Sequence, residues 1–154
     1  MSNGKEHAQR VGWLMGQLQS TEFMLRWWLT KHQGRDVVLP RYVGDTLAET
    51  PITDYRSLGA LIASYNSQLK KEEAKFRVDD AIVDVRDALA HGRILAVGGE
   101  KNLTLFRFER PENGKVRTQA ITELSEDQLV TDIELAEAQF KRVLECGTAR
   151  GYFH

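Results

Sequence analysis

Residues 78–92 read Val-Asp-Asp-Ala-Ile-Val-Asp-Val-Arg-Asp-Ala-Leu-Ala-His-Gly, and they contain both a clear helical pattern and the point where it ends. Four apolar side chains recur at positions i, i+4, i+7 and i+11, which places them on one face of a helix. They are Val78, Ile82, Val85 and Leu89. Because Gly92 is the residue type that commonly ends helices, the stretch predicts a helix from about Glu73 to Ala90 with its apolar face turned to a core.

Beyond Gly92 the apolar period changes to a pattern typical of strands. We predict strands at residues 94–97, 103–109 and 115–120, and the Asn113-Gly114 pair marks a tight hairpin turn. A β insertion at about residues 94–120 is therefore expected.

Three further helices are predicted along the chain. The first covers about residues 6–31, and the second follows Thr53 or Asp54 as its cap and ends at residues 70–71. The last helix opens with Ser125-Glu126-Asp127-Gln128, which has the form of a capping box, and a shorter turn of helix is expected at residues 46–49. Residues 1–154 are thus predicted to form a single mostly-α domain. Its architecture is an up-down bundle of four main helices with a small β-hairpin or sheet inserted before the last helix.

The composition narrows the classes of function. With a net charge of −1 over 154 residues, the chain lacks a surface suited to coating DNA, so any RNA contact is expected in a local cleft. Its single cysteine, Cys146, excludes an intramolecular disulfide. The N-terminus is polar, and the richest apolar run, residues 23–29, contains Arg26 and is too short to span a bilayer. We expect a cytoplasmic protein that has no membrane partner.

The first predicted helix is apolar on two sides. One stripe faces the core, and a second stripe contains Trp13, Phe23, Met24 and Trp27. A helix that is apolar on two sides must be buried on two sides. In a chain of this size we expect the second burial against another copy, so the sequence predicts a homodimer.

Arg86 and His91 are the residues of this helix whose side chains are suited to binding a phosphate and to proton transfer. Arginine keeps its charge at physiological pH and can hold a phosphate through two parallel hydrogen bonds, whereas histidine suits proton transfer near neutrality. On a helical wheel these two side chains are separated by roughly 140°, with the small faces of Val83 and Ala90 between them. Two such helices that met on this face would bring both Arg/His pairs to a shared cleft. Asp87, one turn before His91, is placed to bond the imidazole.

Simpler interpretations of these residues stay open. The aspartates of this helix also fit an ordinary solvated face, with His91 merely ending the helix. Glu22 falls in the core stripe of the first helix, where it either pairs with Arg26 or reaches the cleft as a further catalytic group. A metal held by Asp87 and His91 would need a third ligand, and we expect no metal or cofactor. The hairpin also carries a basic cluster that can steer RNA or form a solvated rim: Arg107, Arg110, Lys115 and Arg117.

The segment resembles the signature of the HEPN superfamily (higher eukaryotes and prokaryotes nucleotide-binding domains). That signature is an Arg and a His separated by a short gap at the end of the third main helix, often with a polar residue directly after the Arg. Arg86, the polar Asp87, a four-residue gap and His91 match it, and the order of the helices matches over essentially the whole chain.

The resemblance implies a homodimeric, metal-independent endoribonuclease. In it Arg86 would hold the scissile phosphate, His91 would act as general acid or base, and Asp87 would support His91. Members of the superfamily act as toxins or phage-defence effectors, which makes an antitoxin protein an expected partner. Others lack catalysis and bind nucleotide, RNA or protein, and this alternative stays open, as does a structural or regulatory dimer. The β insertion is not part of the minimal pattern and leaves the RNA substrate undefined.

Overall fold

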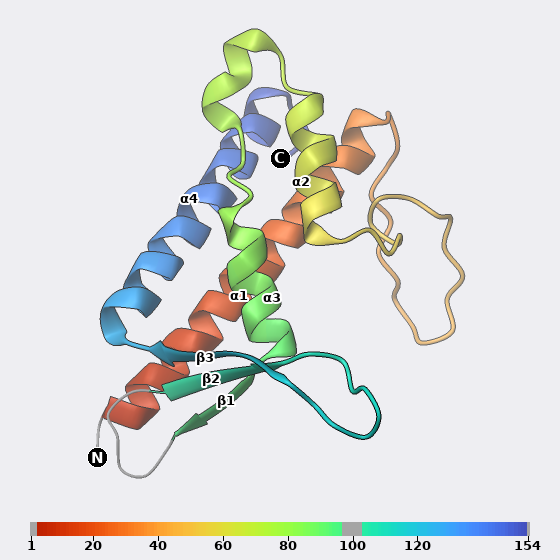
Figure 1. Ribbon diagram of the computed structural model, residues 1–154. Helices are drawn as coiled ribbons and strands as arrows, with labels where there is room; N and C mark the ends of the chain where they lie inside the picture. The colour runs from red at the N-terminus through yellow and green to blue at the C-terminus, as the bar shows by residue number, and fades with distance from the viewer. Residues whose placement is uncertain (1–2, 97–102, 154) are drawn as a thin grey trace. The chain divides into compact units, whose positions relative to one another are not determined.

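A computed structural model describes residues 3–96 and 103–153 (Figure 1). These residues form four α-helices, one 3-10 helix and three strands. In chain order the elements are α1 (Asn3–His32), α2 (Leu58–Ser67), η1 (Lys71–Phe76), α3 (Ala81–His91), β1 (Arg93–Ala96), β2 (Leu103–Phe108), β3 (Thr118–Leu124) and α4 (Glu126–Ala149). The predicted class is confirmed: the fold is mostly α, with a small antiparallel sheet before the last helix. Val97, predicted to end the first strand, lies outside the described residues.

The chain divides into two units, each built from two segments. Unit 1 comprises Met1–Leu18 with Ala81–Ala136, and unit 2 comprises Gln19–Asp80 with Glu137–His154. Helices α1 and α4 therefore supply residues to both units. The sheet and α3 belong to unit 1, whereas α2 and η1 belong to unit 2.

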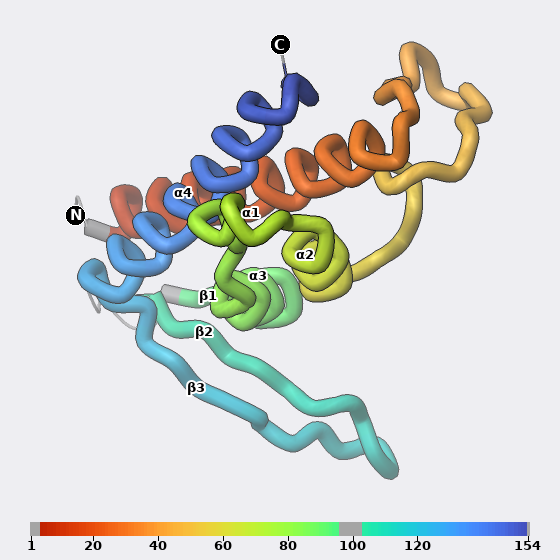
Figure 2. The backbone as a smooth tube through the Cα atoms, turned by 90° about the horizontal axis from the view of Figure 1, so that it is seen from above, coloured from red at the N-terminus to blue at the C-terminus, as the bar shows by residue number. Residues whose placement is uncertain are grey.

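In unit 1, the three strands form an antiparallel sheet in the order β1-β2-β3, and α3 leads directly into β1 (Figure 1). The predicted turn is confirmed, because Asn113 and Gly114 both have positive φ (51° and 73°) between the paired residues Glu112 and Lys115. Figure 2 shows the β2–β3 hairpin that this turn closes. The β structure runs from Arg93 to Leu124, slightly longer than the predicted insertion.

The helix that carries Arg86 is shorter than predicted. It begins at Ala81 rather than near Glu73, because residues 71–76 form the separate 3-10 helix η1. Between the two, in unit 2, the Asn66 side chain accepts a hydrogen bond from the Val78 backbone N–H and donates one to the Val78 carbonyl, both at 2.9 Å. This clamp satisfies the backbone of Val78 outside a helix. Asp80, a residue type favoured at N-caps, directly precedes the shortened helix.

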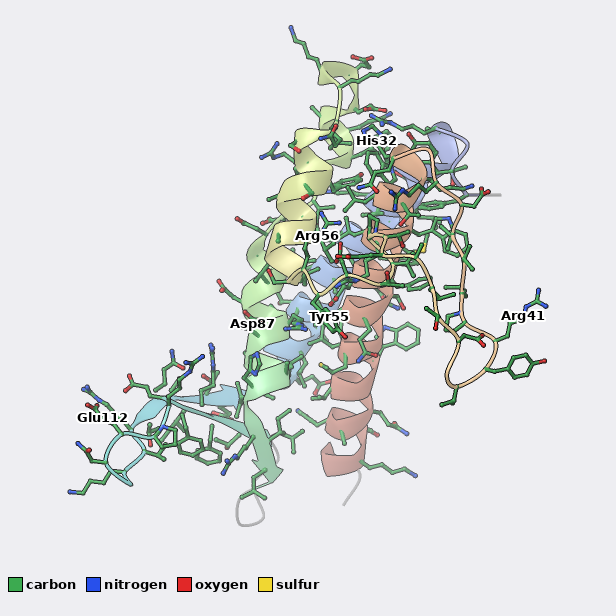
Figure 3. The ribbon with its side chains drawn as sticks, turned by 90° about the vertical axis from the view of Figure 1, so that its right-hand side faces the viewer. His32, Arg41, Tyr55, Arg56, Asp87 and Glu112 are labelled. Atoms are coloured by element: carbon green, nitrogen blue, oxygen red, sulfur yellow. The ribbon has the colours of Figure 1, made fainter. Side chains whose placement is uncertain are left out.

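The predicted start of α2 and the predicted turn of helix at residues 46–49 are wrong. Helix α2 begins at Leu58, where the Ser57 hydroxyl accepts a hydrogen bond from the Ala60 N–H, and residues 46–49 are irregular. Arg26 holds the segment before α2 by donating to the carbonyl oxygens of Pro51, Asp54 and Arg56. These bonds satisfy the backbone without helix, and they leave Tyr55 fully exposed (Figure 3).

The opening of α4 follows the sequence prediction. The Ser125 hydroxyl accepts a hydrogen bond from the Gln128 N–H, as an N-cap should, and the helix starts at Glu126. Within α4, Leu129, Ala136 and Val143 are fully buried. Among the described residues, none of the helices combines the length and the apolar character needed to cross a bilayer.

The second apolar stripe of α1 is covered to different degrees. Trp27 makes edge-to-face contacts with Phe23 and with Phe153 near the C-terminus, so part of this stripe is buried within the chain itself. Trp13 remains 57% exposed and Phe23 37% exposed. The stripe is thus partly open to solvent, as a surface for a second copy requires.

Candidate active site at the end of helix α3

Arg86, Asp87 and His91 lie in the last two turns of α3, in unit 1. The guanidinium of Arg86 and the carboxylate of Asp87 form an ion pair, with Nη1 3.1 Å from Oδ1. Their side chains are 34% and 42% exposed, and His91, the last residue of the helix, is exposed. All three polar groups are therefore accessible to a ligand in solution, and Figure 3 labels Asp87 on this helix.

The structure differs from the expected role of Asp87. Its carboxylate pairs with Arg86, and within residues 3–96 and 103–153 no hydrogen bond joins it to His91. A permanently charged guanidinium is a stronger partner for a carboxylate than an imidazole that need not carry charge. Asp87 is therefore paired with Arg86.

The narrow helix face between Arg86 and His91 carries short side chains and is partly exposed. Val83 is half-buried and Ala90 is exposed. Residues three and four apart lie on one helix face, so Arg86 and Ala90 are neighbours and Asp87 and His91 are neighbours. A second helix can approach this face closely because neither Val83 nor Ala90 has a long side chain.

Glu22 is the fourth candidate residue of the predicted site. It lies in unit 2, where its carboxylate Oε1 is 3.0 Å from Nη2 of Arg26 one turn along α1. Arg26 also pairs with Asp54 at 2.8 Å. Burial alone would raise the pKa of Asp54, but hydrogen bonds from Arg56 and Arg26 hold that pKa below its ordinary value. The pair with Arg26 makes Glu22 part of the network that anchors the segment before α2.

Unit 1 also contains a groove that sequence analysis missed. Its volume is about 300 Å³, and it lies between α3, strands β2 and β3, and α1 and α4 residues of the same unit. Asp132 lines it; burial raises the pKa of this carboxyl, and a 2.9 Å hydrogen bond from the Gln128 amide opposes that rise. The sequence does contain an indication of this groove, because Asp132 follows Leu129 by three positions and so lies on the apolar face of α4. Arg86, Asp87 and His91 are not among the described residues that line this groove.

A second cluster of arginine, carboxylate and histidine lies in unit 2. Arg150 pairs with Glu73, whose Oε1 accepts from Nε at 2.7 Å, and its Nη1 is 3.1 Å from Nδ1 of His32. The guanidinium also lies over the ring of Trp28, 4.8 Å from its centroid. The hydrogen bonds from Arg150 lower the pKa of Glu73 to about 2. Sequence analysis missed this cluster because its members are far apart along the chain.

Unit 2 contains a larger groove, of about 710 Å³, between α2, η1 and a residue of α4. Lys75, Arg77 and Arg142 line it together with Asp79 and Asp80, so its charges of opposite sign are nearly balanced. Arg142 is engaged with the carbonyl of Arg77 at 2.9 Å, which makes it a structural group. In the described part of the chain, no cluster of three or more His, Cys, Asp or Glu side chains is arranged to hold a metal ion.

Comparison of the chain with protein-family models, with curated proteins and with solved structures finds no match. The functional assignment therefore depends on the chemistry of these side chains. Of the groups described, the end of α3 combines a cation, a carboxylate and an exposed imidazole on one short helical segment.

Proposed function

We propose that the protein is a HEPN-like, metal-independent endoribonuclease that acts as a homodimer in the cytoplasm. The observation that carries this proposal is the placement of Arg86 and His91 on the solvent-accessible end of α3, with Arg86 paired to Asp87 at 3.1 Å. A charged arginine held in one direction is suited to a phosphate, and an exposed imidazole is suited to proton transfer. Within the resembled superfamily, a role as toxin or phage-defence effector, with an antitoxin as partner, fits this chemistry.

The proposed reaction uses the RNA itself as the nucleophile. The ribose 2′-oxygen attacks the adjacent phosphorus, and the bond from phosphorus to the 5′-oxygen breaks. His91 takes the proton of the 2′-hydroxyl or gives a proton to the leaving 5′-oxygen, while Arg86 stabilises the charge that develops on the phosphoryl oxygens. The products are a 2′,3′-cyclic phosphate and a 5′-hydroxyl, so that the cyclisation step consumes no water.

A second copy is proposed because one helix does not bring the two groups together. Arg86 and His91 are separated by roughly 140° around α3. Pairing two copies on the face of Val83 and Ala90 would surround one cleft with two Arg/His pairs. Trp13, which is 57% exposed, supplies apolar surface of the kind that such an interface buries.

The test is cleavage of a mixed RNA panel in excess chelator by purified protein. We expect cyclic-phosphate ends from the wild type, and loss of cleavage in Arg86→Ala and His91→Ala. Arg41→Ala is the matched control, because Arg41 is an exposed arginine on the loop of unit 2 (Figure 3). Absence of cleavage by the wild type, or equal cleavage by all variants, would contradict the proposal.

Oligomeric state provides a separate test. Ala90→Arg places a long charged side chain on the exposed narrow face of α3, and we expect it to shift a dimer to monomer in sedimentation experiments and to abolish cleavage. A wild-type protein that is monomeric at micromolar concentration would contradict the shared cleft.

One observation favours an alternative. Asp87 engages Arg86, and among the described residues no hydrogen bond joins it to His91, so Asp87 is not the orienting carboxylate that many general bases have. A non-catalytic HEPN-like module that binds nucleotide, RNA or a protein partner through the same residues fits this arrangement. It predicts RNA binding that needs Arg86 but no cleavage at any RNA concentration.

A further inference from the structure

The sheet of unit 1 has one face that no described element of that unit covers. Alternate residues of a strand point to opposite faces. On the central strand β2, Leu105 and Arg107 line the groove against α3, so Phe106 and Phe108 point to the other face. We call this second face the outer face; it is defined by Arg93, Leu95, Phe106, Phe108 and Ile121.

The register places these side chains in contact range of one another. Arg93 of β1 is the Cα partner of Phe106, and Phe106 is in turn the partner of Ile121 on β3. Leu95 is 59% exposed, Ile121 67% and Phe108 40%. Side chains directly opposite on neighbouring strands interact, so the outer face joins these apolar side chains to one cation at their edge. By the same alternation, Thr104 and the acidic Glu123 also lie on this face.

Arg93 is held over an aromatic ring. Its guanidinium carbon lies 5.3 Å from the centroid of the Phe108 ring. A guanidinium in this position keeps its N–H donors directed outward, and its plane offers the same kind of stacking surface as the ring. The pair is suited to a ligand that combines a flat ring with an anionic group.

The charge of the surrounding segment complements such a ligand. Residues 93–124 contain six basic and four acidic residues, for a net charge of +2, whereas the whole chain carries −1. Three of the basic residues, Arg110, Lys115 and Arg117, are exposed at the end of the hairpin beyond the rings. A polyanion is therefore attracted to this part of the chain more than to the rest of it.

The outer face is also continuous with the end of α3. Only Gly92 separates His91 from Arg93, and α3 runs directly into β1 (Figure 1). Consecutive Cα atoms are about 3.8 Å apart, so the Cα atoms of His91 and Arg93 are separated by no more than about 7.6 Å.

We propose that the outer face binds single-stranded RNA, with bases stacked on Phe106 and Phe108 and a phosphate held by Arg93. This inference rests on the proposed function in one respect, namely that the bound RNA is the substrate presented to Arg86 and His91. Exposed aromatic rings recognise unpaired bases, whereas paired bases are stacked within a duplex and do not reach the rings. The ligand is therefore a loop or single strand.

Binding is tested apart from cleavage in a His91→Ala background, by anisotropy of a fluorescent single-stranded RNA. We expect Phe106→Leu and Phe108→Leu each to weaken binding about tenfold, because each substitution keeps an apolar side chain and removes a stacking surface. Phe108→Trp keeps a ring and should retain the affinity. Ile121→Glu, at an exposed position, should also weaken binding, and Val43→Glu is its matched control because Val43 is fully exposed in unit 2.

The outcomes separate this proposal from the proposed function. Unchanged binding in Phe106→Leu, Phe108→Leu and Ile121→Glu overturns the outer face as an RNA site, whether or not the wild type cleaves. So does equal affinity for duplex RNA. Dissociation of a dimer by these substitutions with RNA binding retained per protomer also overturns it, and assigns the face to a contact between copies. Ring-dependent RNA binding by a wild type that does not cleave supports the outer face and contradicts the nuclease.

Discussion

An arginine, a carboxylate and a histidine lie at the C-terminal end of α3, and another such set lies beside the C-terminal end of α4, in a different state of exposure. At the end of α3, in unit 1, all three side chains are accessible to solvent. More than one-third of the surface of Arg86 and of Asp87 is exposed, and His91 is exposed. At the end of α4, in unit 2, the side chains of Arg150 and Glu73 are only 13% and 14% exposed. His32 completes that second cluster by its contact with Nη1 of Arg150.

The difference lies in what surrounds the guanidinium. Arg150 is covered by the ring of Trp28 and donates to Glu73 and to the carbonyl of Gln68, so its donors are directed to partners within unit 2. Such a cluster fixes the C-terminus to the rest of the unit. Arg86, with 34% of its side chain exposed, is accessible to a phosphate from solvent. Burial, more than residue type, therefore distinguishes a structural cluster from a candidate site.

The largest expected effect separates the two histidines. His91→Ala should lower the rate of RNA cleavage about 10³-fold, the usual contribution of a general acid or base. His32→Ala should leave the cleavage rate of folded protein within about twofold, because His32 belongs to the buried cluster of unit 2. Both rates are measured in chelator at a temperature where circular dichroism shows both variants folded. The reverse order would place the active site at the end of α4.

The next largest effect is on stability: substitution of the two arginines should lower the free energy of unfolding by different amounts. Arg150→Ala leaves the partly buried Glu73 without its main partner and should lower the free energy of unfolding by about 3 kcal/mol. Arg86→Ala removes a pair with Asp87 whose side chains are 34% and 42% exposed, and it should cost less than Arg150→Ala. Urea denaturation measures both. If Arg86→Ala were as destabilising as Arg150→Ala, the end of α3 would be structural and the comparison would fail.

This comparison also shows what the sequence could reveal. The residues at the end of α3 lie within six positions, so the helical period alone places them on one short segment. The cluster of His32, Glu73 and Arg150 depends on the packing of three distant segments, and no local pattern predicts it. The start of α3 was misplaced for a related reason, because the Asn66 clamp on Val78 replaces helical hydrogen bonds with bonds from another element. The sequence predicts Phe106 and Phe108 as strand residues, but only the register of the sheet shows that they share one open face.

A pH titration sharpens the structural side of the comparison. The folded-state pKa of Glu73 is about 2, below its ordinary value of 4.5. A lowered pKa means that the ion pair contributes its full stability above pH 4.5 and loses it as the pH falls toward 2. We expect a loss of about 2 kcal/mol over that window from this group, measured by urea midpoints at each pH. Glu73→Gln should be less stable at pH 6 and should remove this part of the pH dependence; an unchanged slope would contradict the role given to the pair.

The smallest expected effect is the difference in stability between two glycine-to-alanine variants, one at the end of α3 and one near the end of α4. A Cβ on Gly92 would collide with the backbone carbonyl of Ala88 and lie 2.9 Å from Cγ of Leu105, so its collision is partly with atoms that cannot rotate away. The three atoms nearest to a Cβ on Gly147 all belong to the ring of Phe153, a side chain that can shift, and alanine also favours the helix there. Gly92→Ala should therefore cost about 2 kcal/mol and Gly147→Ala about 1 kcal/mol or less. Thermal unfolding of the two variants gives the order of their stabilities.

Gly92 is not among the glycines with positive φ, so a close approach to Leu105 and Ala88, rather than a left-handed backbone, explains the glycine after His91. If Gly92→Ala proved neutral, that close approach would not hold the end of α3 against β2, and the placement of His91 beside the sheet would lose its physical basis.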